Sequence, residues 1–156
     1  MAVLSRVATC LWFADGNGHE AAFASCALMP GDRITTVMPG PDGGTAAVAF
    51  ELMGTPHQAL NGGPRHRLSE AASIVVGTED QAETDRHWDA PCEGGTAPAC
   101  GWLTDRFGVS WQIAPKGLWE MTSSPDREAG GRAFRATEGM VRSDVAQVRA
   151  AFEGRA

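Results

Sequence analysis

The chain has 156 residues, of which 43% are hydrophobic and 21% are charged, proportions that suit one soluble domain with a real core. The net charge is −6 at pH 7 and no cluster of basic residues occurs, which argues against a nucleic-acid-binding protein. No apolar stretch approaches the length of a transmembrane helix, so we expect no membrane association.

The four cysteines bear on the compartment of the protein. Cys10, Cys26, Cys92 and Cys100 show no CxxC spacing of the kind that binds metal. The first 13 residues are too short and too interrupted for a secretory signal. We therefore expect free thiols in a cytoplasmic protein, with a disulfide between Cys92 and Cys100 as an alternative under oxidation.

Residues 6–61 predict the order strand, helix, strand, strand, strand. The helix is expected over 19–29, where apolar residues gather on one face. Glycine-rich turns over 16–18 and 39–44 divide the segments. The apolar runs predict strands over 6–13, 32–38, 45–53 and 57–61.

Residues 69–115 predict the same order again, with one strand faintly marked. A capping box formed by Thr78 and Gln81 opens a helix that runs through Trp88. Matching residues of the two halves lie about 65 positions apart, which suggests duplication of one supersecondary unit. Strands are expected over 69–76, 100–105 and 108–114.

The tail predicts two further helices. Ser124 is expected to cap a helix that begins with Pro125 and reaches about Met140. A last helix is expected after a cap at Ser143 and Asp144. Its apolar face packs either on the body of the same chain or on a second subunit, and it consists of Val145, Val148 and Phe152.

The strings LWF, AFELMGTPHQALNGGP, EAASIVVGTEDQAETDRHW and CGWLTDRFGVSWQIAP together resemble the PhnB-like branch of the vicinal oxygen chelate superfamily. That superfamily includes glyoxalases, bleomycin-resistance proteins and extradiol dioxygenases, and members of the branch are often labelled demethylubiquinone methyltransferases. The resemblance implies an α+β fold of paired βαβββ modules whose mixed sheets curl into a cup, and a homodimer. Module one would span 5–66 and module two 67–115 of a domain over 1–116, followed by the helical C-terminal extension over 117–156.

The resemblance also implies a divalent metal held by His and Glu on the inner strand faces. Carried onto this chain, the ligand positions fall at Thr9, at Ala59 or Asn61, at Ser73 and at Gln112. Each of these side chains offers at most a neutral donor, and a glutamine amide contributes no charge. We therefore expect no tightly bound metal and no other cofactor.

Strand alternation predicts which side chains would line the cup. Trp102, beside Gly101, is the aromatic expected to stack on a ligand. The other tryptophans, Trp12, Trp88 and Trp111, are expected in the core. The predicted ligand-binding residues are Thr9, Leu11, His57, Asn61, Ser73, Trp102, Ser110 and Gln112.

Two functional hypotheses follow. The first is a metal-free homodimeric protein that binds a small molecule in the cup. The second is an enzyme of isomerase, lyase or dioxygenase type, using His57, Glu51 or Asp105 as acid–base groups or a metal site rebuilt around His57 and Glu51. A dimer without any small ligand is a third possibility. Methyl transfer is disfavoured because the glycine-rich segments lie in hairpin turns rather than at a doubly wound switch point.

Each catalytic candidate also has a structural interpretation. A lone histidine such as His57 is more often a surface residue, or one whose hydrogen bonds are satisfied within the fold, than a ligand. Glu51 alternates with Phe50 and Leu52, so it can lie on the solvent face of its strand. Asp105 precedes a Phe-Gly turn, where its carboxylate can accept backbone N–H bonds.

Overall fold

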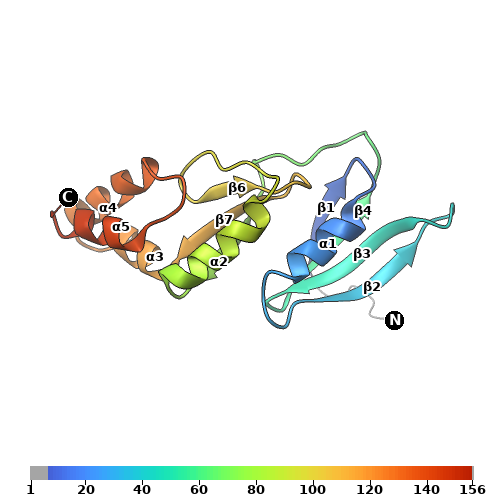
Figure 1. The fold of residues 1–156 in the computed structure, drawn as a ribbon, viewed down its shortest axis with the longest axis horizontal. Coiled ribbons are helices and arrows are strands. Elements are labelled where there is room, and N and C mark those ends of the chain that lie inside the picture. The colour runs from blue at the N-terminus through green and yellow to red at the C-terminus, as the bar shows by residue number, and fades with distance from the viewer. Residues whose placement is uncertain (1–6, 156) are drawn as a thin grey trace. The chain divides into compact units, whose positions relative to one another are not determined.

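The computed structural model describes residues 7–155 and divides the chain into two compact units, one ending at Ser69 and one beginning at Glu70 (Figure 1). Each unit combines a mixed sheet with helices, so the expected α+β class is confirmed. Among the described residues, no helix has both the length and the apolar character needed to cross a bilayer. The joining of the two sheets into one cup stays a prediction.

The first unit is a four-stranded sheet with one helix against it. The strands follow the order β1-β4-β3-β2, in which β1 and β4 are parallel and the other neighbours antiparallel. This is the predicted βαβββ sequence of elements. The elements are β1 (Thr9–Phe13), α1 (Gly18–Cys26), β2 (Arg33–Pro39), β3 (Thr45–Leu52) and β4 (Thr55–Asn61).

Helix α1 covers the sheet face that carries Phe13, Phe50 and Ala59. These three side chains are at most 2% exposed and form the core of the unit. The helix can approach closely because Gly18 has no side chain. A Cβ at Gly18 would lie 2.7 Å from Oδ1 of Asn61 and 3.0 Å from the Phe13 ring. The core of the first unit therefore lies between α1 and one face of its sheet.

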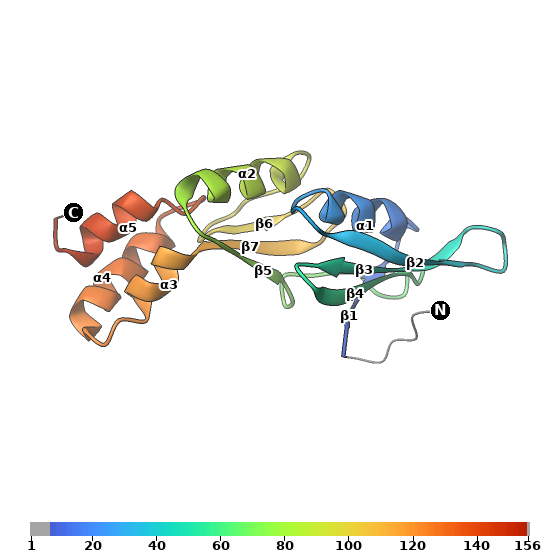
Figure 2. The same cartoon turned by 90° about the horizontal axis from the view of Figure 1, so that it is seen from below.

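The second unit is a three-stranded sheet in the order β5-β7-β6, parallel between β5 and β7 and antiparallel between β6 and β7. Figure 2 shows α2 along one face of this sheet and the last three helices beyond its end. The elements are β5 (Ile74–Thr78), α2 (Gln81–Cys92), β6 (Trp102–Thr104), β7 (Ser110–Pro115), α3 (Lys116–Thr122), α4 (Arg127–Glu138) and α5 (Val145–Phe152).

The second module has one strand fewer than the first. Where the additional strand was expected, the described chain forms one isolated antiparallel bridge between Thr96 and Thr104. The segment before the bridge approaches β6 too closely for side chains, since a Cβ at Gly95 would overlap the carbonyl oxygen of Thr104. Glycine and proline in this segment shorten the strand to a single bridge.

The predicted capping box at the start of α2 is wrong in position. Asp80 is the N-cap, and its Oδ1 accepts a hydrogen bond from the backbone N–H of Glu83 at 2.8 Å. The Glu83 carboxylate accepts in return from the N–H of Glu79 at 2.6 Å. Thr78 belongs to β5, and its hydroxyl lies 2.6 Å from that of Thr84. Pairing with β7 extends the strand beyond the predicted helix start.

The predicted cap of α4 is likewise displaced. Asp126, not Ser124, is the N-cap, and its Oδ1 accepts from the N–H groups of Glu128 and Ala129, each at 3.1 Å. Ser124 instead accepts from the N–H of Asp126 at 3.2 Å. In both cases a carboxylate closer to the helix takes the capping position from a hydroxyl. Asp144 caps α5 as predicted.

The apolar face of α5 packs on the same chain. Val148 is fully buried against Met121 of α3 and Ala133 of α4, and Val145 and Phe152 pack around this cluster. Of the two alternatives for this face, the structure shows the intramolecular one. Helix α3, which supplies part of the contact, was not predicted.

Candidate functional site

The sheet of the second unit leaves one face free of helices. Gln112 of β7 pairs with Val75 on one side and with Trp102 on the other. Directly paired residues project to the same face of a sheet. The opposite face carries Trp111 and Ile113, each 1% exposed, beneath α2. Val75, Gln112 and Trp102 therefore form a row across the face that α2 does not cover.

The amide of Gln112 is fixed by Ser73, the residue that directly precedes β5. Its Nε2 donates to the Ser73 hydroxyl oxygen at 2.8 Å. Among the described residues, no hydrogen bond uses the amide oxygen of Gln112 or the hydroxyl hydrogen of Ser73. Ser73 and Gln112, two of the four positions where the resemblance implies a metal ligand, are therefore in contact here. The amide oxygen of Gln112 can accept a hydrogen bond from a third group, and the hydroxyl of Ser73 can donate one.

Ser110 adds a polar group on the same face, two residues before Gln112. Its side chain is 3% exposed, and its hydroxyl has no hydrogen-bond partner among the described residues. A buried hydroxyl without a partner costs about 1–3 kcal/mol. A water molecule or ligand that paired with it would recover this free energy.

A pocket of about 170 Å³ opens beside Gln112. Strand β7 leads directly into α3, so that helix stands next to the glutamine and α4 closes the other side. Two aromatic side chains of these helices, Trp119 and Phe134, line the pocket and are 56% and 57% exposed. We call this site the Gln112 pocket; its walls also include Cys100, Ala114, Leu118 and Thr122.

Trp119 and Phe134 were not among the ligand-binding residues predicted from the sequence. A helical projection of α4 could have indicated the exposure of Phe134. The buried positions of the helix include Ala129 and Ala133, which are spaced by four residues and share one face. Phe134 follows one position later and therefore lies off the buried face. A large aromatic beside a face of small buried residues is a feature of the sequence that could have indicated a ligand or partner contact.

The predicted facing of the first module is wrong by one residue. Thr9, Leu11 and His57 project to the face that α1 covers, and Leu11 and His57 are 8% and 5% exposed. The His57 ring stacks on Phe50 at 5.3 Å, and its Nδ1 lies 3.0 Å from the carbonyl oxygen of Thr55. Strand alternation has a period of two, so an error of one position inverts the face.

Asn61, also predicted to bind ligand, uses its side chain within the fold. Its Oδ1 accepts from the N–H of Gly18 at 2.8 Å, and its Nδ2 donates to a carbonyl of β3 at 2.8 Å. The next two glycines hold Trp12: a Cβ at Gly62 would overlap its ring, and the carbonyl of Gly63 accepts from its Nε1 at 2.8 Å. Trp12 is therefore half-buried beside this turn, not in the core as predicted.

Glu51 and His57 do not share a site. Phe50 pairs with His57 across β3 and β4, so the adjacent Glu51 projects to the opposite face of the sheet. Its carboxylate forms an ion pair with Arg33 at 2.6 Å. The two side chains therefore cannot bind one metal ion together, and the hypothesis of a site rebuilt around this pair lacks support.

Asp105 stabilises the turn before β7. Its Oδ1 accepts from the N–H groups of Phe107 and Val109 at 2.9 and 3.0 Å, and its Oδ2 accepts from the indole of Trp111 at 3.0 Å. Burial raises the pKa of this carboxyl, although the three hydrogen bonds and the charge of Arg106 act in the opposite direction. The geometry matches the structural interpretation of Asp105, and a catalytic role stays a hypothesis.

The residues present do not fit the divalent metal that the resemblance implies. Within residues 7–155, no three His, Cys, Asp or Glu side chains gather in a way that could hold a metal ion. The two implied positions that do meet carry a hydroxyl and an amide, which are neutral donors. Neutral oxygen donors alone compete poorly with water for a divalent ion.

A family model described as 3-demethylubiquinone-9 3-methyltransferase matches residues 5–114. The chain belongs to this family. The match includes both sheets and Gln112, and it ends before α3. The aromatic walls of the Gln112 pocket, Trp119 and Phe134, thus come from a part of the chain that the family model does not cover. A comparison with curated proteins found no match.

Solved structures that superpose with TM-scores above 0.5 share the fold of this chain. The PhnB protein of Bacillus cereus superposes with a TM-score of 0.64 at 22% identity, covering 71% of this chain and 99% of that one. A Pseudomonas aeruginosa protein gives a TM-score of 0.58 at 21% identity, covering 70% and 96%. A glyoxalase/bleomycin resistance protein of Albidiferax ferrireducens gives 0.42 at 10% identity, covering 68% and 93%. The resemblance to the PhnB-like branch of the vicinal oxygen chelate superfamily is confirmed.

Proposed function

We propose that the protein binds an uncharged small molecule in the Gln112 pocket, without a tightly bound metal. The observation that carries this proposal is the 2.8 Å hydrogen bond from Gln112 to Ser73. It fixes a neutral amide at the position where the resemblance implies a metal-binding glutamate. A fixed amide with a free carbonyl oxygen is suited to recognising a polar group rather than an ion.

The composition of the pocket supports a ligand with a flat apolar part. Trp119 and Phe134 supply aromatic surface, and Gln112, whose amide is held by Ser73, supplies a polar point. A volume of about 170 Å³ accommodates a small compound, or one ring of a larger compound. We therefore expect an aromatic or unsaturated ring bearing one carbonyl or hydroxyl group.

Methyl transfer is not part of the proposal, although the family description names it. Binding of S-adenosylmethionine in the usual way needs a doubly wound parallel sheet with a glycine-rich loop at its switch point. The two sheets here follow the orders β1-β4-β3-β2 and β5-β7-β6, with antiparallel neighbours in each. This arrangement supports a binding role over methyl transfer.

The ligand test uses a library of neutral ring compounds that carry a carbonyl or hydroxyl group, screened by ligand-observed NMR. We expect hits whose binding weakens by about tenfold or more in Gln112→Ala, the usual size for losing one hydrogen bond in a closed site. Gln58→Ala is the matched control, because Gln58 is a half-buried glutamine of the other sheet. Hits that bind equally to both variants would contradict the proposal.

The metal test uses protein purified without a histidine tag. Metal content is measured by plasma mass spectrometry before and after incubation with nickel or iron. We expect less than about one tenth of an equivalent throughout, because neutral donors bind divalent ions poorly. One bound equivalent that survives dialysis would overturn the metal-free proposal.

We also propose a homodimer in a reducing, cytoplasmic compartment. Large exposed side chains of the second unit, Val75, Trp119, Phe134 and Val141, support self-association, since apolar surface of this kind is usually covered. The four free cysteines support the compartment. Light scattering in solution should give twice the chain mass, and a monomer mass would contradict the dimer.

A further inference from the structure

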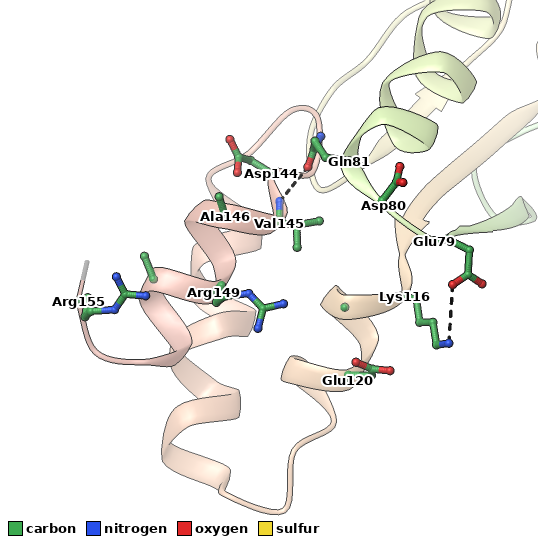
Figure 3. Close-up of a pocket in the computed structure, with 12 residues that line it drawn as sticks. Glu79, Asp80, Gln81, Lys116, Glu120, Asp144, Val145, Ala146, Arg149 and Arg155 are labelled. Atoms are coloured by element: carbon green, nitrogen blue, oxygen red, sulfur yellow. Dashed lines mark hydrogen bonds and ion pairs between the residues drawn. The ribbon is translucent and has the colours of Figure 1, made fainter.

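A second cleft lies in the same unit, between the start of α2, the helix α3 and the helix α5 (Figure 3). Its volume is about 800 Å³, and it shares no lining residue with the Gln112 pocket. Three basic and four acidic side chains line it, so its net charge is close to zero. Nothing in the proposed binding function uses this cleft.

Most of these charges already have partners. Asp80 caps α2, and Asp144 caps α5 by accepting from a backbone N–H at 2.9 Å. Lys116 forms an ion pair with Glu79 at 3.7 Å. Arg155, at the edge of the cleft, pairs with a glutamate that follows α5. These groups shape the cleft, but they are engaged within the protein.

Arg149 and Glu120 are different, because neither forms an ion pair with another residue among those described from 7 to 155. Figure 3 shows Arg149 reaching from α5 toward the first turn of α3. Its Nη2 lies 4.0 Å from the place where a Cβ on Gly117 would be. The guanidinium of Arg149 therefore lies close to the backbone of α3 at Gly117, which also lines the cleft.

Glu120 follows Gly117 by three positions, so the two lie on the same face of α3, about one helical turn apart. One unpaired cation, Arg149, and one unpaired anion, Glu120, therefore line the same cleft, one from α5 and the other from α3. Small side chains of α5, Ala146 and Ala150, form the adjacent wall. A lining with one unpaired group of each sign suits a small molecule that carries both charges.

We propose that this cleft binds a small zwitterion with one carboxylate and one ammonium group, of the class of free amino acids. The guanidinium of Arg149 can take the carboxylate through two parallel hydrogen bonds, and the carboxylate of Glu120 accepts from the ammonium group. A plain anion would meet the unpaired Glu120, and a plain cation would meet the unpaired Arg149. The near balance of charge in the cleft therefore favours a ligand with both signs.

The test is an NMR titration of the isotope-labelled full chain with a panel of L-amino acids. Each amino acid is compared with the amine and the carboxylate that lack its second charge. We expect saturable shifts at the Gly117 amide with one or more amino acids, and binding at least about tenfold weaker for the single-charge analogues. Equal binding of an amino acid and its analogues would overturn the proposal, as would the absence of saturable shifts for the whole panel.

Two variants test the assigned groups. Arg149→Gln and Glu120→Gln should each weaken binding of the amino acid by about tenfold or more. Both side chains are exposed and unpaired within the described chain, so thermal unfolding should be unchanged. Arg127→Gln is the matched control, since Arg127 is an exposed arginine outside the cleft. Retained binding in Arg149→Gln would overturn the assignment, and it would leave the Gln112 proposal intact.

Discussion

At the residue scale, several side chains have roles that differ from those that their functional groups would suggest. His57, Glu51 and Asp105 all carry groups suited to acid–base chemistry, yet each is engaged within the fold. Gln112 is chemically modest, but it stands on an uncovered face with its carbonyl oxygen free of partners among the described residues. Availability of the group, more than its reactivity, distinguishes the candidate site.

Asp105 should make the stability of the protein depend on pH. Burial raises its pKa above the ordinary 3.8, so the fold favours the protonated carboxyl. The stabilisation from this proton is complete below pH 3.8 and is lost as the pH rises through the raised value. We expect the free energy of unfolding to fall with rising pH over that interval, and this slope to be absent in Asp105→Asn.

Urea unfolding at a series of pH values measures this slope. The exposed carboxylate of Asp42, in the turn between β2 and β3, provides the control variant Asp42→Asn, which should keep the wild-type dependence. A difference between wild type and Asp105→Asn that does not change with pH would show that burial does not govern this carboxyl.

At the scale of the element, close approach decides the packing of both units. Gly18 lets α1 approach its sheet, and Gly62 leaves the space that the Trp12 ring occupies. Helix α5 is held by Val148, which contacts α3 and α4. The pair Gly62-Gly63 is therefore explained by its packing against Trp12, and no bound ligand is needed to account for it.

Gly62→Ala should be strongly destabilising. Its Cβ would overlap the Trp12 ring and displace it from its hydrogen bond to Gly63. We expect a loss of about 2–4 kcal/mol, because overpacking and a lost buried hydrogen bond combine. Gly77→Ala is the matched control, since a Cβ there meets nothing within 4 Å. Thermal unfolding of the two variants tests this, and equal melting temperatures would refute the packing role.

At the scale of the whole molecule, the chain is divided between Ser69 and Glu70 into two compact units. The segment from 62 to 73, after β4 and before β5, forms no helix and no strand. Its residues from 64 to 67 are exposed. The division between units therefore coincides with an accessible, irregular segment.

Limited proteolysis should detect this division. Trypsin is expected to cut first after Arg65 or Arg67, since exposed irregular backbone is cleaved faster than helices and strands. The ion pair between Arg67 and Asp15 is exposed and offers little protection. Mass spectrometry of the earliest fragments identifies the site. A first cut inside a helix or sheet of either unit would contradict the assigned division.

Much of the local structure could be predicted from the sequence, while the site could be predicted only in part. The βαβββ order of the first unit and the residues on the apolar face of α5 were correct. The facing of the first sheet was not, because alternation fixes which residues share a face but not which face a helix covers. The caps of α2 and α4 were displaced because nearby carboxylates compete for the same N–H groups.

The sequence by itself determined the family, the element order and the neutral character of the implied ligand positions, since all three depend on local pattern or residue type. Tertiary structure alone decided that Trp119 and Phe134 stand beside Gln112, and that Arg149 lies over Gly117. These pairs join residues that are separate in the chain, and their contacts arise from the packing of α3, α4 and α5. Packing between distant segments depends on the whole set of buried contacts, which no local pattern of residues specifies.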